Sequence, residues 1–482
     1  MSVNSIFFLL FLPPVVWIHY TLPKRYQYLW LFTASLFFYL SNDIRYIIGL
    51  AFCIITTYAA GLLLVKINDS GRKWILLSCI AANLTSLFLF RYLLPDSPFV
   101  PLGISFYSLQ AIGYIIDVFR GKTAAEKNVI RYAVYIAFFP TVISGPIQRS
   151  FDLLPQIKAG RSFDYNKAHS GLYLLFWGYF IKVVIADQLG PMVDFAFKSP
   201  EEMPGATLLW ATVLYAVQLY CDFAGYSVLA IGTAKMLGFD IGVNFMRPYF
   251  STSVRDFWSR WHISLSTWLK DYVYIPLGGS RKGKCRTQLN LLVTFLVSGM
   301  WHGGGVNFMA WGALHGVYRI LENLLSGIIP KKLMEDHPGK NASDNSKMHR
   351  GWSSMASRIF RIIGTFVLVD FAWLFFKADS LEQAFAILYR IFFCFHFNEM
   401  TYYGSYLLGG TRQNLLLMLL GIIVVFAVDY IHERKISIEN VMAGKMPTVA
   451  RWAVYITFAL LLLFVAVRNY GQAASTFIYE RF

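Results

Sequence analysis

The sequence is poor in charged residues, which make up only 15% of its 482 positions. Soluble domains carry about 25%, so this chain cannot cover a water-facing surface of its size with polar side chains. An ordinary soluble protein is therefore excluded. Acidic residues are the scarcer sign, with 27 Asp and Glu against 43 Lys and Arg, which gives a formal net charge of +16. In a lipid-embedded chain such an excess is typical of cytoplasmic loops, and we expect no nucleic-acid partner.

Several motifs of soluble and secreted enzymes are also missing. The cysteines are few, odd in number and far apart, at Cys53, Cys79, Cys221, Cys285 and Cys394. This spacing gives neither a disulfide framework nor a metal-ligand motif, so we expect no metal site. No serine stands in a Gly-x-Ser-x-Gly elbow, and no cysteine lies near a histidine in sequence, so a covalent acyl-enzyme on this chain is not expected. No basic residue precedes the first apolar stretch, which excludes the order typical of a cleaved signal peptide.

What the sequence has is apolar runs of about 20 residues, long enough to cross a bilayer. Hydrophobic residues make up 56% of the chain, and the mean hydropathy is +0.50. After an N-terminal run at 1–20, the others lie near residues 27–40, 44–65, 74–94, 99–119, 170–188, 206–233, 287–301, 306–325, 357–376, 413–432 and 451–468. Because basic loops alternate with uncharged ones, we predict an all-α polytopic protein of the cell (inner, cytoplasmic) membrane, with about ten to twelve transmembrane helices and an external N-terminus.

Three segments depart from this alternation. Residues 132–148 have basic residues on both sides and are interrupted by two prolines and a glycine, which predicts a re-entrant or interfacial segment. Residues 381–397 are predicted to lie along the membrane surface, since a crossing there would move later basic residues outside. The polar, basic segment 330–350 is predicted to be a cytoplasmic loop. No repeat or second domain is visible, so residues 1–482 are predicted to form a single integral-membrane domain.

The first functional candidate lies in residues 254–270. Helical spacing predicts two stripes, one apolar and one polar, made of Phe257, Trp261, Leu265 and Trp268 and of Arg255, Ser259, His262 and Ser266. His262 is therefore expected to face a polar compartment. Four basic residues follow closely, at Arg281, Lys282, Lys284 and Arg286. The pattern fits an interfacial aromatic helix with an ordinary basic loop, or a basic cytoplasmic mouth for a phosphate-bearing donor.

The second candidate is the hairpin at 287–325. The sequence Trp301-His-Gly-Gly-Gly305 interrupts the apolar run, and a second helix is predicted from Val306 to about Leu325. If the break lies toward the outer face, His315 is about nine residues, or roughly 14 Å, down this helix and close to mid-bilayer. An imidazole at that depth needs a partner or a water-filled cavity. Gly312 and Gly316 beside it would let another helix or a substrate approach, and a satisfied structural histidine is the alternative.

A neutral histidine suits an acyl transfer in which a hydroxyl attacks a thioester. It can take the hydroxyl proton near neutral pH, and such a base contributes about 10²- to 10⁴-fold. Direct attack by the acceptor is then the simplest mechanism. Three intramembrane carboxylates, Asp117, Asp222 and Asp370, could orient a histidine, or each could pair with a neighbouring base.

Eight ordered segments then resemble a known family. They are Pro101 to Gln110, Phe138 to Pro140 with Ser144 to Arg149, Gln218 to Tyr226, Asn244 to Tyr249, Phe257 to Ser266, Asp271 to Gly279, Trp301 to Gly303 and Trp311 to Gly316. The chain resembles the membrane-bound O-acyltransferase family, specifically its bacterial polysaccharide O-acetyltransferase branch of the alginate O-acetylase type. The motif-bearing core covers about residues 101–325. At Ala224 and Val228 the relatives usually have a serine and an aspartate, two polar side chains that this chain lacks.

The resemblance implies a helical ring thinned by funnels from both faces, with the acyl donor entering from the cytoplasm and the acceptor from outside. It implies that His315 matches the family's essential histidine and His262 its second active-site polar residue. We assign His315 as the general base and His262 as the group that polarises or positions the reactants. His302 is assigned a structural role at the hairpin turn. Further residues expected to line the site are Asp222, Tyr226, Asn244, Arg255, Trp258, Trp261 and His302.

The expected reaction moves an acetyl group from a cytoplasmic thioester, acetyl-CoA, to a hydroxyl of an exported polysaccharide or of a relay protein. The basic cluster of Arg281, Lys282, Lys284 and Arg286 would bind the donor's phosphates. The resemblance implies an extracytoplasmic SGNH-type acetyltransferase partner, and no permanently bound cofactor is expected. One alternative is D-alanyl transfer to teichoic acid from a carrier protein. Another is a transporter or flippase, which predicts paired broken helices, whereas one break is visible.

Overall fold

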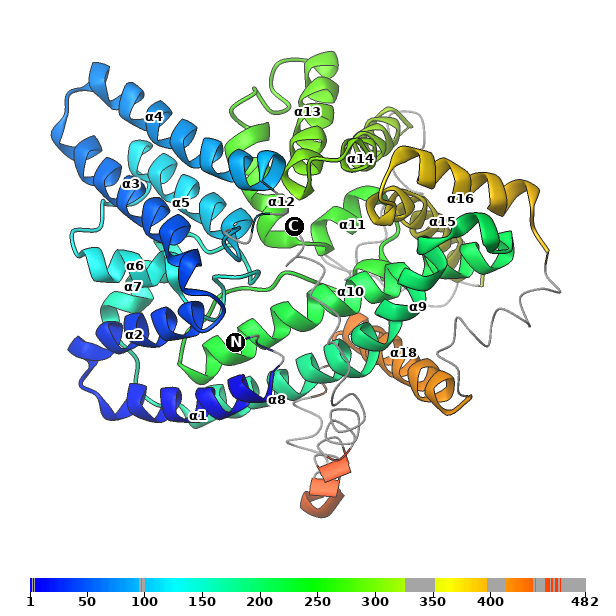
Figure 1. Ribbon diagram of the computed structural model, residues 1–482, viewed down its shortest axis with the longest axis horizontal. Coiled ribbons are helices and arrows are strands. Elements are labelled where there is room, and N and C mark those ends of the chain that lie inside the picture. Colours follow the sequence, from blue (N-terminus) through cyan, green and yellow to red (C-terminus); the bar gives the residue numbers. More distant parts are fainter. Residues whose placement is uncertain are drawn as a thin grey trace, which may run out of the picture. The chain divides into compact units, whose positions relative to one another are not determined.

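The structure is a computed structural model of the chain (Figure 1). It describes all residues except 2, 4, 95–96, 98–99, 326–351, 397–411, scattered positions between 437 and 459, and 461–482. Within these described residues the secondary structure is helical, without a strand, which confirms the all-α prediction. The predicted loop at 330–350 and most of the predicted span at 451–468 lie outside the described residues.

The chain divides into two compact units. The first comprises Met1–Phe195, Val217–Asn244 and Gly404–Phe482, and the second comprises Ala196–Ala216 and Phe245–Tyr403. Helices α9 (Asp187–Lys198) and α10 (Gly205–Met236) contribute residues to both. The single integral-membrane domain over 1–482 stays a prediction, and each unit is described below by itself.

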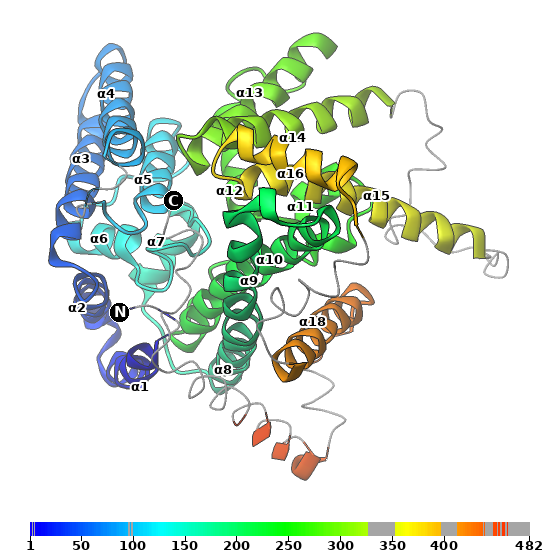
Figure 2. The same ribbon diagram turned by 45° about the vertical axis from the view of Figure 1, so that its right-hand side comes forward.

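The first unit is built mainly from the N-terminal helices. These are α1 (Ile6–Thr21), α2 (Gln27–Leu40), α3 (Ile47–Lys66), α4 (Asp69–Phe88), α5 (Ile104–Phe119), α6 (Val129–Ala137), α7 (Ser150–Ala159), α8 (Tyr165–Tyr179) and, from the C-terminal part, α18 (Arg412–Glu433). Helices α3, α4 and α5 lie side by side (Figure 2). Their close approach is possible because small residues stand at the contacts, for example Gly61 of α3 against the Tyr114 ring of α5.

The predicted re-entrant segment is short and buried. Helix α6 has nine residues, about 14 Å of rise, and ends at Ala137. The chain then turns through residues 138–145 inside the protein, where nearly every side chain is buried. Non-helical backbone is tolerated at such a place because protein groups surround it. The segment 132–148 therefore does not form a full span, as the basic residues on both sides predict.

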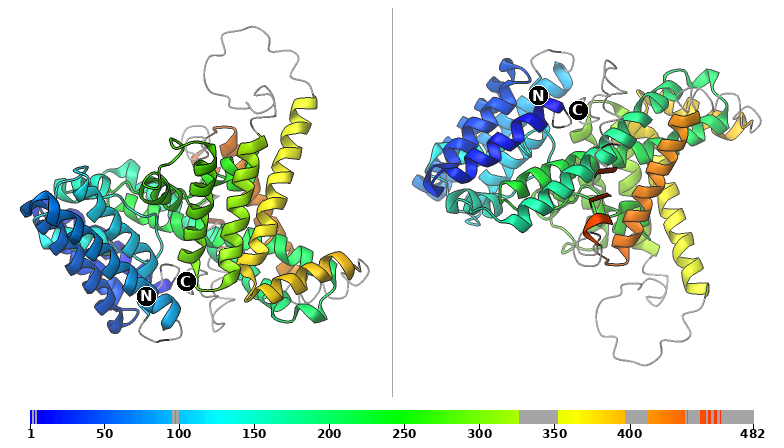
Figure 3. Two further views of the ribbon diagram at one scale, coloured as in Figure 1. Left: turned by 90° about the horizontal axis from the view of Figure 1, so that it is seen from above. Right: turned by 90° about the horizontal axis from the view of Figure 1, so that it is seen from below.

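The second unit carries the motif-rich part of the chain. Its helices are α11 (Val254–Arg260), α12 (Ile263–Leu269), α13 (Lys284–His302), α14 (Val306–Leu325), α15 (Trp352–Lys377) and α16 (Leu381–Phe393). Helices α13, α14 and α15 lie side by side (Figure 3). The hairpin predicted at 287–325 is confirmed, because α13 ends at His302 and α14 begins at Val306.

Glycines allow α13 and α14 to touch backbone to backbone. A Cβ on Gly312 would collide with the carbonyl oxygen of Phe295, and one on Gly299 with that of Phe308. A Cβ on Gly316 would lie 2.9 Å from a Leu292 methyl group. The expectation that Gly312 and Gly316 admit another helix is confirmed, and the helix is α13.

Five described helical stretches are long and apolar enough to cross a bilayer. They are Ile44–Lys66, Gly71–Leu93, Tyr165–Lys198, Gly205–Met236 and Met355–Lys377. Helices α1 and α5 are apolar but shorter. These findings fit a polytopic membrane protein, whereas the total of ten to twelve spans stays a prediction.

The hairpin contact predicts a difference between two glycine substitutions. Gly312→Ala should lower the free energy of unfolding by about 1–3 kcal/mol, because a methyl group does not fit against the α13 backbone. Gly364→Ala, in α15 with nothing within 4 Å of the added carbon, should leave stability unchanged or raise it by up to about 1 kcal/mol. Thermal unfolding of the detergent-purified variants, followed by size-exclusion chromatography, measures the difference. Equal midpoints would contradict the contact.

Candidate active site

His315 lies inside a cage of aromatic rings in the second unit. Its side chain is 0% exposed, and six ring centroids lie 5.0 to 6.3 Å from that of the imidazole. The rings belong to Phe257 and Trp258 of α11, Phe295 of α13, Trp311 and Tyr318 of α14, and Trp373 of α15. Trp311 stands four residues before His315, a spacing that places both on one helix face. The cage therefore brings four helices to one imidazole.

The two nitrogens of His315 have different surroundings. The indole N–H of Trp258 donates a hydrogen bond to Nδ1, with a nitrogen to nitrogen distance of 3.2 Å. Nε2 is buried and has no hydrogen-bond partner among the described residues. The expectation that an imidazole at this position needs a partner is thus met at one nitrogen, by a residue from another helix.

His262 lies at a break and not within a helix. Helix α11 ends at Arg260, α12 begins at Ile263, and His262 between them has φ 42° and ψ 54°, the left-handed conformation. The single helix that the spacing of 254–270 predicts is therefore wrong. The apolar stripe survives the break, since Phe257, Trp261, Leu265 and Trp268 are all buried.

The imidazole of His262 is also buried, at 1% exposure, and packs 6.0 Å from the ring of Trp301. The helical pattern predicted that it faces a polar compartment, and this orientation is wrong because the break turns the side chain inward. A left-handed non-glycine residue is uncommon, and such residues gather at functional sites.

Ring contacts connect the three motif histidines. Trp301 packs 4.8 Å from His302, His302 packs 5.0 Å from Trp311, and Trp311 packs 5.1 Å from His315. Since His262 contacts Trp301, all three histidines belong to one buried aromatic cluster. Trp261, another residue predicted to line the site, joins it through Trp373, with centroids 5.0 Å apart. His302 ends α13, at the turn where the sequence placed it.

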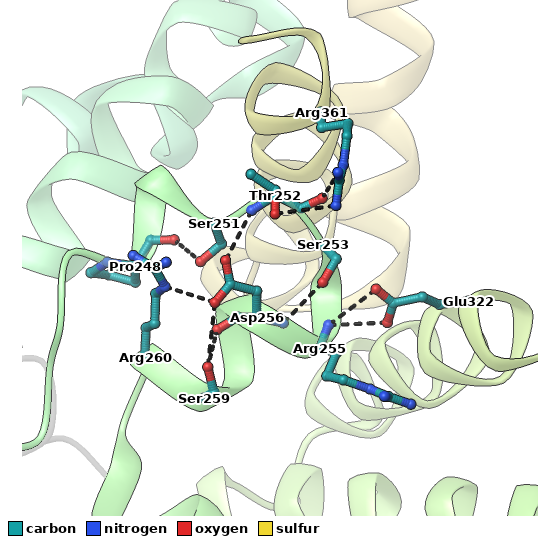
Figure 4. A network of polar contacts seen from close by, with 10 residues as sticks. All are labelled: Pro248, Ser251, Thr252, Ser253, Arg255, Asp256, Ser259, Arg260, Glu322 and Arg361. Carbon is teal, nitrogen blue, oxygen red and sulfur yellow. Dashed lines mark hydrogen bonds and ion pairs between the residues drawn. The ribbon is translucent and has the colours of Figure 1, made fainter. Parts of the chain in front are cut away.

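Arg255 takes part in a network that holds α11 against α14 (Figure 4). Its backbone N–H donates to the Glu322 carboxylate at 3.0 Å, and its guanidinium donates to Asn323 at 2.7 Å. Glu322 also pairs with Arg319 one turn earlier on α14. The start of α11 is fixed further by the Ser253 hydroxyl, which accepts the backbone N–H of Asp256. This network sets the position of α11, and with it that of Trp258 beside His315.

Asp222, Tyr226 and Asn244 belong to the first unit. Asp222 pairs with Lys182 at 2.5 Å, and Lys182 also binds Asp187 at 2.6 Å, with all three side chains largely buried. The alternative that Asp222 pairs with a neighbouring base is confirmed. Tyr226 is buried, and the amide of Asn244 donates to the Ser227 hydroxyl at 3.2 Å. Their role in lining the site stays a prediction.

The other two carboxylates are also buried. Asp370 accepts a hydrogen bond from the Thr212 hydroxyl at 3.0 Å, and Asp117 is 1% exposed. Among the described residues no group of three His, Cys, Asp or Glu is placed to hold a metal ion.

The basic cluster of Arg281, Lys282, Lys284 and Arg286 is exposed, just before and within the first turn of α13. A helix N-terminus already carries partial positive charge, so four bases there strengthen the attraction for an anion.

The sequence does not predict Trp373 as a site residue, because it lies outside every motif. Only its apolar span carried a signal, and a span does not tell which side chain faces the site.

Comparison with known proteins gives the family. The model of the membrane-bound O-acyltransferase family (MBOAT) matches residues 102–343. A probable alginate O-acetylase of Pseudomonas fluorescens is 36% identical over 390 residues, 79% of this chain and 73% of the relative. The chain belongs to the membrane-bound O-acyltransferase family. A peptidoglycan O-acetyltransferase of Helicobacter pylori is 31% identical over 75% of this chain and 72% of its own length. A teichoic acid D-alanyltransferase of Bacillus subtilis is 26% identical over 61% of this chain and 80% of its own length.

The protein is therefore a multi-pass membrane O-acyltransferase, as its motifs predict. Two of the family-like segments, Phe257 to Ser266 and Trp311 to Gly316, supply three of the six cage rings and both histidines. A transporter or flippase is not supported. The acyltransferase carries its histidine cluster within the second unit, on helices that the glycine contacts and the Glu322 network hold together.

The buried charges of the acyltransferase predict unequal effects of two lysine substitutions. Lys182→Met should lower the free energy of unfolding by about 3–5 kcal/mol, because Asp187 and Asp222 then lose their counter-charge. Adding Asp222→Asn should restore part of the loss. Lys167→Met breaks an exposed pair with Asp240 and should cost about 0–1 kcal/mol. The yield and thermal midpoint of folded protein measure both, and similar losses for the two lysines would contradict the buried network.

Proposed function

We propose that this acyltransferase moves an acetyl group from a cytoplasmic thioester, acetyl-CoA, to a hydroxyl of an exported polysaccharide or of a relay protein. The observation that supports this most is the cage around His315, in which one imidazole nitrogen is held by Trp258 and the other has no partner among the described residues. A neutral imidazole there can donate a hydrogen bond to a reacting group or accept one from it. The cage is also largely hydrocarbon, which keeps water from hydrolysing a thioester.

Acyl transfer from a thioester to a hydroxyl needs two catalytic groups. One group must take the hydroxyl proton, and another must stabilise the negative charge that grows on the carbonyl oxygen. His315 and His262 supply two imidazoles for these roles. The sequence predicts that His315 takes the proton and that His262 polarises or positions the reacting groups.

The acceptor and the partners are proposed from the relatives. The two O-acetyltransferases named above act on alginate and peptidoglycan, so we propose an exported glycan as acceptor, a cytoplasmic-membrane location, and an extracytoplasmic SGNH-type partner that finishes the transfer. D-alanyl transfer to teichoic acid from a carrier protein is the second candidate, since the Bacillus relative is named a teichoic acid D-alanyltransferase. Parallel reactions with acetyl-CoA and with a D-alanyl carrier thioester distinguish the two donors.

His315→Ala should lower acetyl transfer by about 10²- to 10⁴-fold, because the reacting imidazole is lost. His396→Ala, at an exposed histidine after α16, is the matched control and should act like the unchanged protein. Membrane vesicles receive labelled acetyl-CoA, and both the label in the polysaccharide fraction and the released CoA thiol are measured. Normal transfer by a well-folded His315→Ala protein would contradict the proposed site.

The basic cluster predicts a donor-specific effect on KM. Changing Lys282, Lys284 and Arg286 to Glu should raise the KM for acetyl-CoA about tenfold or more and leave kcat nearly unchanged, because only binding of the donor's phosphates is weakened. Changing Lys66 and Lys73 to Glu, two exposed bases predicted on the same membrane side, should have little effect.

Acetyl N-acetylcysteamine, a thioester without phosphates, provides a second control for this cluster. Its KM should be the same for the unchanged protein and the triple variant. An equal rise in KM for both thioesters would mean that the cluster acts on folding or on the membrane surface and not on the phosphates.

A further inference from the structure

We infer that the cage around His315 binds the carbonyl oxygen of the acyl group through three neutral N–H donors: Nε2 of His315 and the indole nitrogens of Trp311 and Trp373. The inference rests on the proposed function and deepens it. It assigns catalytic contacts to two tryptophans, and it gives His315 the role of hydrogen-bond donor.

The three donors share one condition and one place. Other buried polar atoms of the described residues also lack a hydrogen-bond partner, for example the Thr207 and Thr233 hydroxyls, but these three lie together in one aromatic cluster. Each lies on a side chain that is at most 1% exposed, and none has a hydrogen-bond partner among the described residues. They are neighbours in one cluster: the rings of Trp311 and Trp373 stack at 5.7 Å, and the His315 ring lies 5.1 Å from Trp311 and 6.1 Å from Trp373. Trp30, in the first unit, behaves as indoles normally do and donates to the Val15 carbonyl at 3.0 Å.

Buried donors without acceptors are rare because each loses its hydrogen bonds to water and gains nothing in return. Three of them in one cluster indicate an acceptor that comes from outside the chain. The surrounding rings suit a small apolar acyl group. Neutral donors suit an oxygen that is uncharged in the bound thioester and becomes negative only as the hydroxyl attacks, which is the requirement for stabilising a transition state more than a ground state.

Trp258 determines which form of His315 the site presents. An indole nitrogen can only donate, so Nδ1 of His315, which receives that hydrogen bond, must offer its lone pair. A neutral imidazole carries one proton, and here the proton is on Nε2. A neutral histidine with a fixed tautomer is a known way to polarise a carbonyl. Trp258 is therefore a positioning residue, and the Glu322 network that fixes α11 supports it.

The acceptor hydroxyl oxygen bonds to the thioester carbon, and the carbonyl electron pair moves to its oxygen, which the three N–H groups stabilise. When the pair returns, the bond from carbon to sulfur breaks and the thiolate leaves. The hydroxyl proton passes to the thiolate sulfur by way of His262. The roles of the two histidines are thus the reverse of those that the sequence predicts, and the following variants decide between them.

The first experiment removes the indole donors. Trp311→Phe and Trp373→Phe should each lower kcat for thiol release from acetyl-CoA about 10²-fold and raise KM much less, because the lost hydrogen bond is weak in the bound thioester and strengthens in the transition state. Trp30→Phe removes an indole hydrogen bond far from the histidine cluster in sequence and should leave kcat unchanged per folded molecule. Unchanged kcat in both cage variants would overturn the inference.

The second experiment compares two amides at position 315. The side-chain nitrogen of a glutamine can take the place of Nε2, whereas that of an asparagine reaches only the place of Nδ1. If His315 donates, His315→Gln should retain at least tenfold more activity than His315→Asn. If His315 must accept a proton, neither amide can replace it, and both variants should be as inactive as His315→Ala.

The third experiment tests the role of Trp258 by a signature that folding alone does not change. The protein is labelled with ¹⁵N at histidine, and the imidazole NMR signals of His315 are identified by their absence from the His315→Gln variant. These signals should show the proton on Nε2. Trp258→Phe should produce a mixture of both tautomers. A single proton on Nδ1 in the unchanged protein would overturn the inference.

A binding measurement covers the case in which the tryptophan variants lose catalysis through misfolding. The unchanged protein should bind a CoA analogue with a ketone in place of the thioester more tightly than the corresponding thioether without oxygen. Trp311→Phe and Trp373→Phe should lose this preference while still binding the thioether. Failure of the proposed function appears differently, as no consumption of acetyl-CoA by the unchanged protein.

Discussion

Hydrocarbon offers no hydrogen-bond partner, so every polar group that a chain carries to membrane depth must be satisfied by another part of the protein or of its substrate. Several buried polar groups of the acyltransferase follow this constraint. Lys182 lies between Asp187 and Asp222, and Asp370 binds a threonine hydroxyl. The Gln148 amide donates to the Pro146 and Ile241 carbonyls. Each of these groups links segments that are distant in sequence.

Under the same constraint, a buried polar group without a partner in the protein indicates a partner from the substrate. Around His315 the packing is tight: glycines bring the α13 and α14 backbones together, and Glu322 holds the start of α11. A cluster that is packed this closely could have satisfied its indole nitrogens with nearby carbonyl groups, as Trp30 does. Trp311 and Trp373 thus have no partner in the described part of the chain although their surroundings are closely packed, and this points to a ligand.

The sequence predicts the elements of this region better than their contacts. Apolar length and the glycine-rich break give the start of α14 at Val306 and its end at Leu325 as the structure has them. The break at His262 escapes prediction, because the apolar spacing of Phe257, Trp261, Leu265 and Trp268 continues through it while one residue adopts a left-handed conformation. Periodicity detects which side chains are buried, and it is insensitive to a single backbone turn that keeps them buried.

The candidate site is predictable to a similar degree. Two histidines and Trp258 stand in motifs, so a resemblance finds them, whereas Trp373 is one apolar residue among many in its span. No sequence pattern tells which nitrogen of His315 carries the proton either, since that depends on the donor that α11 brings to Nδ1. The role of each residue in the candidate site therefore depends on tertiary contacts between helices.

The use of neutral donors has a consequence for how the acyltransferase separates binding from chemistry. A lysine or arginine in the cage would have to be desolvated at high cost, and it would attract the phosphates of the donor as strongly as the carbonyl oxygen. The bases just before and within the first turn of α13 are exposed, and in the proposed function they bind these phosphates in water. Charge thus stays at the surface, where it can set donor affinity, and the buried N–H groups are left to act on a charge that exists only during the reaction.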